Sequence, residues 1–359
     1  MANLLDYLRW RGDLPFTADA INEVDGLILS QLSMLHWENG LKDGESGTLE
    51  ALFPAINKQP VSVGFTADDD AKLLQLVASC ARYRDILVCD YAHEFDADTE
   101  MQFAAVTLCL PDGARFVSFR GTDSTIVGWK EDCNMAFSKP VPAQEAARAY
   151  LERAAEAAPG ALYVGGHSKG GNLAVYAAST VSDAVLARVV AVYDNDGPGL
   201  SDRIDAAARY ARIGDRLHSF VPQSSVVGML LAHPNTYEVV KSDSISVLQH
   251  NPYSWQVEGP RFVHLPELNR DSVRFEAAFR KWLSEVDEDQ RSVLIENLFD
   301  VLSATDAQHF GKDFWQALAR NPMALFRAIQ GISPDSRRQI GQLFMELANA
   351  ALHPGDDEP

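Results

Sequence analysis

Strand-like and helix-like segments alternate through the middle of the chain, and this alternation restricts the fold more than any other feature. The strand-like segments are short, apolar and rich in β-branched residues, whereas the helix-like segments repeat their apolar residues every three or four positions. The order is helix 142–157, strand 161–166, helix 171–180, strand 185–195, helix 201–211, strand 216–221 and helix 224–232. Such alternation predicts a parallel sheet with crossover helices on its faces.

Flanking segments extend this pattern on both sides. Two apolar runs, 101–110 and 114–120, enclose the turn Pro111-Asp112-Gly113 and predict a β-hairpin. Residues 68–83 begin with three aspartates and continue with apolar residues at helical spacing, which predicts a helix. Residues 236–242 and 244–250 are strand-like, and 26–35 suits either a buried strand or a helix.

Composition narrows the classes of partner. The 359 residues are 47% hydrophobic, enough for one large domain, or one domain with an appendage. Fifty acidic against 31 basic side chains give a formal net charge of −19, which disfavours nucleic acid and anionic membranes as partners. The chain opens without the pattern of a secretory leader and contains no apolar run long enough to cross a bilayer.

The four cysteines predict unpaired thiols. Cys80, Cys89, Cys109 and Cys133 are widely spaced and form no C-x-x-C pair or metal-ligand pattern. Together with the missing leader, this favours a reducing, cytoplasmic location over a disulfide-stapled secreted fold.

The stretch "LYVGGHSKGGNLAVYAA" carries the strongest indication of chemistry. Its Gly166-His167-Ser168-Lys169-Gly170 core is a G-x-S-x-G pattern between a strand and a helix, the context of a nucleophile elbow. Gly166 and Gly170 let the backbone pass close to its neighbours while Ser168 adopts a strained conformation. The alternative is a glycine-rich turn with an idle serine. A nucleotide-binding P-loop does not fit, because Lys169 lies inside the glycines.

A nucleophilic serine also needs donors for the oxyanion. Lys169 offers its backbone N–H at the start of the helix. The second candidate is Thr122, which follows a strand ending in Arg120-Gly121 and can present both its N–H and its hydroxyl. The alternative for Thr122 is to cap an ordinary turn.

Several motifs, taken in order, resemble those of known hydrolases. "SFRGT" with Trp129 and Asp132 after it, then "GGHSKGG", resembles the class 3 lipases, and "DGPG", "VPQSSVVGMLL" and "LQHNPYSW" resemble a bacterial, lipase-related group, the Mbeg-like family. The likeness runs from the opening residues to about Trp255. It implies an α/β-hydrolase fold with Thr122 as an oxyanion residue.

His250 is the predicted general base. In this fold the residues follow in the order serine, acid, histidine, and His250 ends a strand-like segment near the end of the lipase-like region. It also aligns with the histidine of the lipases. The alternative is a histidine that merely closes a strand by bonding a carbonyl group.

The acid is less well defined by the sequence. Lipases carry an aspartate two residues before the Val-Pro that ends the next strand, but Ser219 stands there. Asp196 follows the preceding strand at the same sheet edge and is the first candidate, although it also suits a turn before Gly197-Pro198. The remaining alternatives are a Ser-His dyad and the aspartates near other strand ends, Asp194, Asp215 and Asp243.

These expectations combine into one hypothesis. The chain is a cytoplasmic serine hydrolase that cleaves a carboxylic ester of a small or lipid-like substrate, without metal or organic cofactor, and its alternative is a non-catalytic binding protein of the same fold. Met229, Leu230 and Leu231, with the C-terminal helices, suit an acyl-binding wall or plain core. The expected domains are an α/β-hydrolase domain over 1–265, a helical appendage over 266–352 and a disordered tail over 353–359. The oligomeric state is not predicted.

Overall fold

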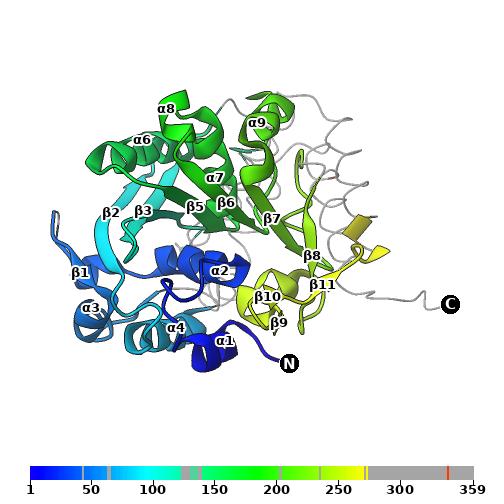
Figure 1. Ribbon diagram of the computed structural model, residues 1–359. Coiled ribbons are helices and arrows are strands. Elements are labelled where there is room, and N and C mark those ends of the chain that lie inside the picture. Colours follow the sequence, from blue (N-terminus) through cyan, green and yellow to red (C-terminus); the bar gives the residue numbers. More distant parts are fainter. Residues whose placement is uncertain are drawn as a thin grey trace, which may run out of the picture.

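The described chain folds around a mixed nine-stranded sheet with helices on both faces (Figure 1). The computed structural model describes residues 1–42, 44–62, 66–122, 131, 134–135, 140–201, 204–233, 236–270, 272–273 and 338. The strands of the large sheet are β1 (Gly47–Thr48), β2 (Leu87–Asp96), β3 (Met101–Cys109), β4 (Arg115–Phe119), β5 (Leu162–His167), β6 (Val189–Asn195), β7 (Leu217–Pro222), β8 (Glu238–Val240) and β11 (His264–Leu265). A separate small hairpin pairs β9 (Val257–Glu258) with β10 (Arg261–Phe262).

Helices connect and cover these strands. The α-helices are α1 (Leu4–Arg11), α2 (Glu23–Gln31), α3 (Leu49–Ile56), α4 (Ala67–Ser79), α6 (Pro142–Ala157), α7 (Lys169–Thr180), α8 (Asp183–Leu186) and α9 (Ala206–Ile213). The 3-10 helices are η1 (Leu32–Met34), η2 (Trp37–Asn39), η4 (Gly214–Arg216), η5 (Ser246–His250) and η6 (Pro252–Ser254).

The strand order is β1-β2-β3-β4-β5-β6-β7-β8-β11. Strands β4 to β8 are parallel to one another, whereas β1 to β4 and the pair β8–β11 are antiparallel. The β3–β4 hairpin and the alternation of β5, α7, β6, α9 and β7 agree with the sequence prediction. The predicted α/β-hydrolase fold is therefore confirmed.

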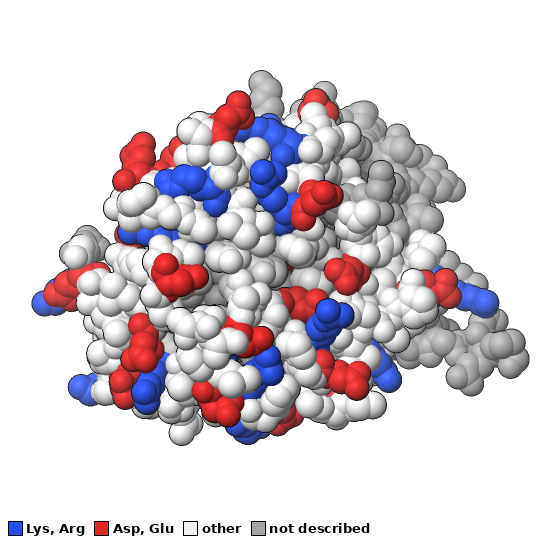
Figure 2. Space-filling model, viewed as in Figure 1, with Lys and Arg blue, Asp and Glu red and all other residues white. Residues whose placement is uncertain are grey.

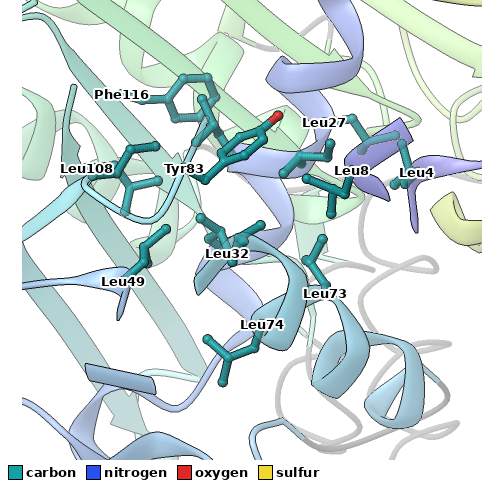
Figure 3. Close-up of a cluster of buried hydrophobic side chains, with 14 of the residues drawn as sticks. Leu4, Leu8, Leu27, Leu32, Leu49, Leu73, Leu74, Tyr83, Leu108 and Phe116 are labelled. Carbon is teal, nitrogen blue, oxygen red and sulfur yellow. The ribbon is translucent and has the colours of Figure 1, made fainter. Parts of the chain in front are cut away.

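Two apolar layers hold the helices to the sheet. On one face, side chains of α1, α2 and α4 pack against residues of β3 and β4, as Figure 3 shows for Leu8, Leu27, Leu73, Leu108 and Phe116. On the other face, α6, α7 and α9 bury a second cluster against the parallel strands. The sheet is thus the middle of three layers.

The segment 26–35, which the sequence left open, is the end of α2 followed by η1. Its helical state follows from a capping box: the Asn22 side chain accepts hydrogen bonds from Val24 N and Asp25 N, and the Asp25 carboxylate accepts from Asn22 N. The residues of this capping box precede the apolar run, so the spacing of apolar residues within the run did not indicate the helix.

Two secondary-structure predictions were wrong. Residues 224–232 form turns rather than a helix, and Gly228 N donates to the Asp196 carboxylate instead of to a helical carbonyl. The Ser225 hydroxyl donates to the same carboxylate. Residues 244–250 end in the 3-10 helix η5 rather than in a strand. Both segments are short, and tertiary hydrogen bonds override their local preference.

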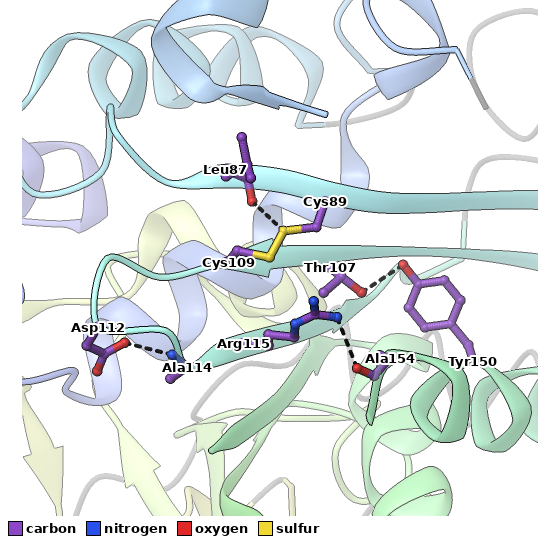
Figure 4. The surroundings of a disulfide bond; sticks show 9 residues. All are labelled: Leu87, Cys89, Thr107, Cys109, Asp112, Ala114, Arg115, Tyr150 and Ala154. Carbon is purple, nitrogen blue, oxygen red and sulfur yellow. Dashed lines mark hydrogen bonds between the residues drawn. A yellow bond between two sulfur atoms is a disulfide. The ribbon is translucent and has the colours of Figure 1, made fainter. Parts of the chain in front are cut away.

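The prediction of unpaired cysteines was wrong for two of the four. Cys89 and Cys109 form a disulfide between the antiparallel strands β2 and β3, where the register shifts next to Cys89 (Figure 4). Neighbouring strands bring together residues that are 20 positions apart, which spacing alone does not reveal. The cysteines therefore give no support to a reducing location. The cytoplasmic location remains a prediction that no longer draws on the cysteines.

Among the described residues, no helix has the length and apolar character that crossing a membrane requires. The expected helical appendage, 266–352, lies outside the described residues apart from a few positions, and the expected tail, 353–359, lies entirely outside them. Trp129, Asp132 and Cys133 are outside them as well.

Candidate active site

Ser168 lies at a sharp turn between the end of β5 and the start of α7. Its backbone has φ 58° and ψ −133°, a left-handed conformation that a non-glycine residue adopts only under constraint. Its N–H donates to Asn195 O at 3.0 Å, which fixes the turn against the end of β6. The strand, the strained residue and the helix together have the geometry of a nucleophile elbow.

Two glycines make this turn sterically feasible. A Cβ atom on Gly166 would lie 2.1 Å from the carbonyl carbon of Gly170, and one on Gly170 would lie 2.1 Å from Phe119 O. Both distances are far inside van der Waals contact, so only glycine fits either position. The predicted close approach of the backbone at these two glycines is confirmed.

His250 and Asp196 meet in a direct hydrogen bond. The distance from His250 Nδ1 to Asp196 Oδ2 is 2.7 Å; the carboxylate is fully buried and the His250 side chain is 28% exposed. An ionised carboxylate only accepts hydrogen bonds, so Nδ1 carries the proton and the lone pair is left on Nε2. This is the tautomer that a general base needs.

The Asp196 carboxylate is held by further donors. Its Oδ1 accepts hydrogen bonds from the Ser225 hydroxyl at 2.5 Å and from Gly228 N at 3.1 Å. Asp196 also adopts a positive φ, 52°, directly after the end of β6. The oxygen facing His250 is thereby fixed in direction.

Ser219 occupies the position where the lipases carry their acid, and its hydroxyl donates to Asp194 Oδ2 at 3.0 Å. Asp194 Oδ1 accepts from Gly197 N at 3.1 Å. Burial raises the pKa of Asp194 to about 7, and the negative charge of Asp196 adds to the effect. Asp194 therefore supports the turn that carries Asp196, while Asp196 contacts the histidine.

The other two aspartates considered from the sequence are placed differently. Asp243 is exposed and pairs with the N-terminal ammonium of Met1 at 3.3 Å. Asp215 is exposed in η4. Neither position suggests a partner for His250.

Thr122 and Lys169 both lie at the elbow. Phe119 pairs with Gly166 across β4 and β5, so the chain leaving β4 passes Ser168. A Cβ atom on Gly121 would come within 2.8 Å of His167 O and 3.4 Å of Ser168 Cβ, which shows how close the segment before Thr122 lies. Lys169 is the first residue of α7, where a backbone N–H has no intrahelical partner.

Sequence reasoning missed the role of the Lys169 side chain. It is fully buried and forms an ion pair with Glu131, and its Nζ also donates to Gln102 O at 2.7 Å. The Glu131 carboxylate accepts from Gln102 N and from Ala143 N, both at 3.0 Å. The ion pair therefore joins the elbow to β3 and α6, and the position of Lys169 inside the glycines was its only sequence signal.

His167 was missed as well. Its Nε2 lies 2.8 Å from His250 O, and the two imidazole rings stack with their centroids 4.5 Å apart. Because His167 directly precedes Ser168, this contact brings His250 to the elbow. In the sequence, the position of His167 between Gly166 and Ser168 was the feature that could have indicated it.

A group of potential metal ligands lies elsewhere in the described chain. Glu23, Glu238 and His264 approach one another on the surface. His264 Nε2 is 2.8 Å from Glu23 Oε1 and its Nδ1 is 3.2 Å from Glu238 Oε2, so both ring nitrogens already face carboxylates. This arrangement is a doubly paired histidine. His264 and Glu238, but not Glu23, line a pocket of about 380 Å³ beside β8 and β11.

The sheet topology and the elbow define a protein with the α/β-hydrolase fold. The model of the Mbeg1-like family matches residues 77–300, more than half of the chain. The chain therefore belongs to the Mbeg1-like family. The resemblance to this family, proposed from the sequence motifs, is confirmed.

Solved structures with a similar fold include two from Penicillium. A mutant form of MDLA from Penicillium cyclopium is 13% identical over 66% of this chain and 82% of its own, with a TM-score of 0.41. A triacylglycerol lipase from Penicillium expansum is 14% identical over 49% of this chain and 76% of its own, with a TM-score of 0.31. No curated protein sequence matches the chain.

Proposed function

We propose that the protein is a serine hydrolase of the esterase or lipase type, which cleaves a carboxylic ester through an acyl-enzyme on Ser168. The observation that carries this proposal is the hydrogen bond from His250 Nδ1 to the buried Asp196, next to the strained Ser168 turn. A serine, a histidine and a buried carboxylate in this relation are the components of nucleophilic acyl transfer.

In the proposed mechanism, His250 Nε2 removes the proton from Ser168 Oγ as the oxygen attacks the ester carbonyl carbon. The negative charge that develops on the carbonyl oxygen is stabilised by the Lys169 N–H and by Thr122. Asp196 stabilises the imidazolium that forms on His250. The imidazolium then protonates the leaving alcohol, and a water molecule activated by His250 releases the acid and regenerates Ser168.

The alternative, a binding protein without catalytic activity, rested on the absence of the lipase acid at Ser219. Asp196 supplies a carboxylate to His250 from the preceding strand, which supports the enzyme over the binding protein. We further propose a small or lipid-like ester as substrate and the cytoplasm as location.

Hydrolysis of p-nitrophenyl esters over a range of acyl lengths tests the proposal. The wild-type protein is expected to turn over at least one chain length, and Ser168→Ala is expected to lower kcat by about 10⁴-fold or more. Ser79→Ala, at an exposed position at the end of α4, is the matched control and should retain full activity. A folded wild-type protein without turnover at any acyl length would favour the binding protein.

A further inference from the structure

His250 lies in a segment with little regular secondary structure of its own. It is the last residue of the short 3-10 helix η5, and η6 begins two residues later. A single 3-10 turn has poor hydrogen-bond geometry and gives the backbone little rigidity. The position of the His250 ring must therefore depend on side chains that hold this segment from outside.

One of these anchors is the residue that precedes the proposed nucleophile. His167 Nε2 is 2.8 Å from His250 O, and since a carbonyl oxygen only accepts, Nε2 is the donor. The two rings also stack, with centroids 4.5 Å apart and planes inclined by 30°. His167 thus contacts both the backbone and the ring of His250.

The environment of His167 suits a neutral ring. The side chain is buried at the end of β5, and this burial, with the neighbouring His250, lowers the pKa of His167 well below its usual range. A neutral His167 keeps one N–H for the carbonyl and places no positive charge against His250 when that ring accepts a proton.

A second anchor holds the residue before His250. Trp255 Nε1 donates to Gln249 O at 2.9 Å, and Gln249 Oε1 accepts from Ser224 N at 2.8 Å. The Trp255 ring lies edge-on to His167, with centroids 6.5 Å apart. These contacts restrain Gln249, whereas His167 bonds directly to the backbone carbonyl of His250.

We propose that His167 is a positioning residue that couples the base to the nucleophile. Its imidazole ties the His250 backbone to the residue next to Ser168, so that the ring keeps its distance to Ser168 and its alignment with Asp196. This inference rests on the proposed function for its kinetic consequences. A displacement of about 1 Å at a reacting group can cost up to about 10²-fold in rate.

Two substitutions separate this role from plain packing. His167→Gln retains an amide N–H at the reach of Nε2, whereas His167→Leu has a similar volume and no donor. We expect His167→Leu to lower kcat about 10- to 100-fold with KM changed less than about threefold, and His167→Gln to stay within about fivefold of wild type.

The pH profile gives a second readout. Contact with Asp196 stabilises the His250 imidazolium, and displacement of the His250 ring weakens this contact. The acid limb of kcat/KM should therefore move to lower pH in His167→Leu and stay in place in His167→Gln. If His167→Leu does not fold, His167→Asn replaces it, because its shorter amide cannot reach the carbonyl.

Nitrogen-15 NMR of the imidazole groups makes the test independent of turnover. The His250 Nδ1–H signal, shifted downfield by Asp196, should persist in wild type and His167→Gln and weaken or shift in His167→Leu. If the wild-type protein shows no ester turnover but the variants give this NMR pattern, the proposed function is wrong and the positioning of His250 by His167 still holds. Unchanged kcat, pH profile and NMR signal in His167→Leu would overturn the inference, as would equal losses in both variants.

Discussion

Asp194 and Asp196 are two residues apart, yet their surroundings give the two carboxyl groups different chemistry. Asp196 accepts hydrogen bonds from Ser225, Gly228 and His250, whereas Asp194 is buried with Ser219 and Gly197 as partners. Environments that separate the behaviour of adjacent carboxyl groups are typical of catalytic sites. In the proposed mechanism they distinguish Asp196, which orients the histidine, from Asp194, which supports the turn.

Asp196→Asn should lower kcat for ester hydrolysis by about 10⁴-fold, because the amide stabilises the wrong tautomer of His250 and cannot compensate its positive charge. Steady-state kinetics on the folded variant measures this. Asp194→Asn is the matched control, an identical change two residues away, and should retain kcat within about tenfold. Comparable kcat values for the two variants would remove Asp196 from its proposed role.

Asp194 also predicts how stability depends on pH. Its pKa is about 7 in the folded protein against an ordinary value of 3.8. At pH values between these two, the carboxyl group is therefore ionised in the unfolded chain and protonated in the folded protein. The carboxyl group therefore reduces the free energy of unfolding as pH rises from about 4 to about 7. The difference in unfolding free energy between Asp194→Asn and wild type should grow in favour of the variant over this range, as measured by urea titration at several pH values. A constant difference would contradict the raised pKa.

At the scale of elements, the buried Lys169–Glu131 ion pair ties α7 to its neighbours. Gln102 at the start of β3 and Ala143 in the first turn of α6 complete its hydrogen bonds. Removing one member of such a pair leaves an uncompensated buried charge, whereas removing both does not.

Lys169→Met should therefore lower the free energy of unfolding by about 3–5 kcal/mol, and the double variant Lys169→Met with Glu131→Gln should recover much of that loss. Denaturant unfolding of the two single variants and the double variant forms a double-mutant cycle. Strictly additive effects would show that the two charges do not interact.

The sequence predicted the elements whose pattern is local. The Pro-Asp-Gly turn predicts the β3–β4 hairpin. The change from strand-like to helical spacing of apolar residues at the glycines predicts β5, the turn at Ser168 and α7. The backbone conformation of 224–232 and of His250 could not be predicted in this way. It depends on hydrogen bonds to Asp196 and His167, which are remote in the chain.

The same reason limited the prediction of site residues. Ser168 stands in a motif, Asp196 could be ranked by its position directly after a strand, and His250 by its order in the chain after the serine and the acid. Glu131 carries no such signal, since only the fold reveals that it meets Lys169 in the core. The partner of a buried charge is determined by packing and not by spacing.

At the scale of the whole molecule, the sheet brings together residues that are distant in sequence. Thr122 follows β4, Ser168 follows β5 and Asp196 follows β6, so all three lie at the carboxyl ends of neighbouring parallel strands. This edge is where open α/β sheets commonly hold their ligands.

The surface is acidic overall but not uniformly so. The chain has a formal net charge of −19, yet Figure 2 shows basic side chains interspersed with acidic ones on one face, gathered over the region of α6 to α9. Two arginines of this region, Arg188 and Arg212, donate to backbone carbonyls of nearby helix ends. Their charge stabilises the fold locally.

Covalent labelling with a fluorophosphonate, followed by intact-mass and peptide mass spectrometry, tests the assignment of Ser168 as the nucleophile most directly. We expect one adduct per chain, located on Ser168, in the wild-type protein and in Ser79→Ala, and none in Ser168→Ala. A folded wild-type protein that takes up no label, or a Ser168→Ala variant that labels as fully as wild type, would contradict the assignment of Ser168 as the nucleophile.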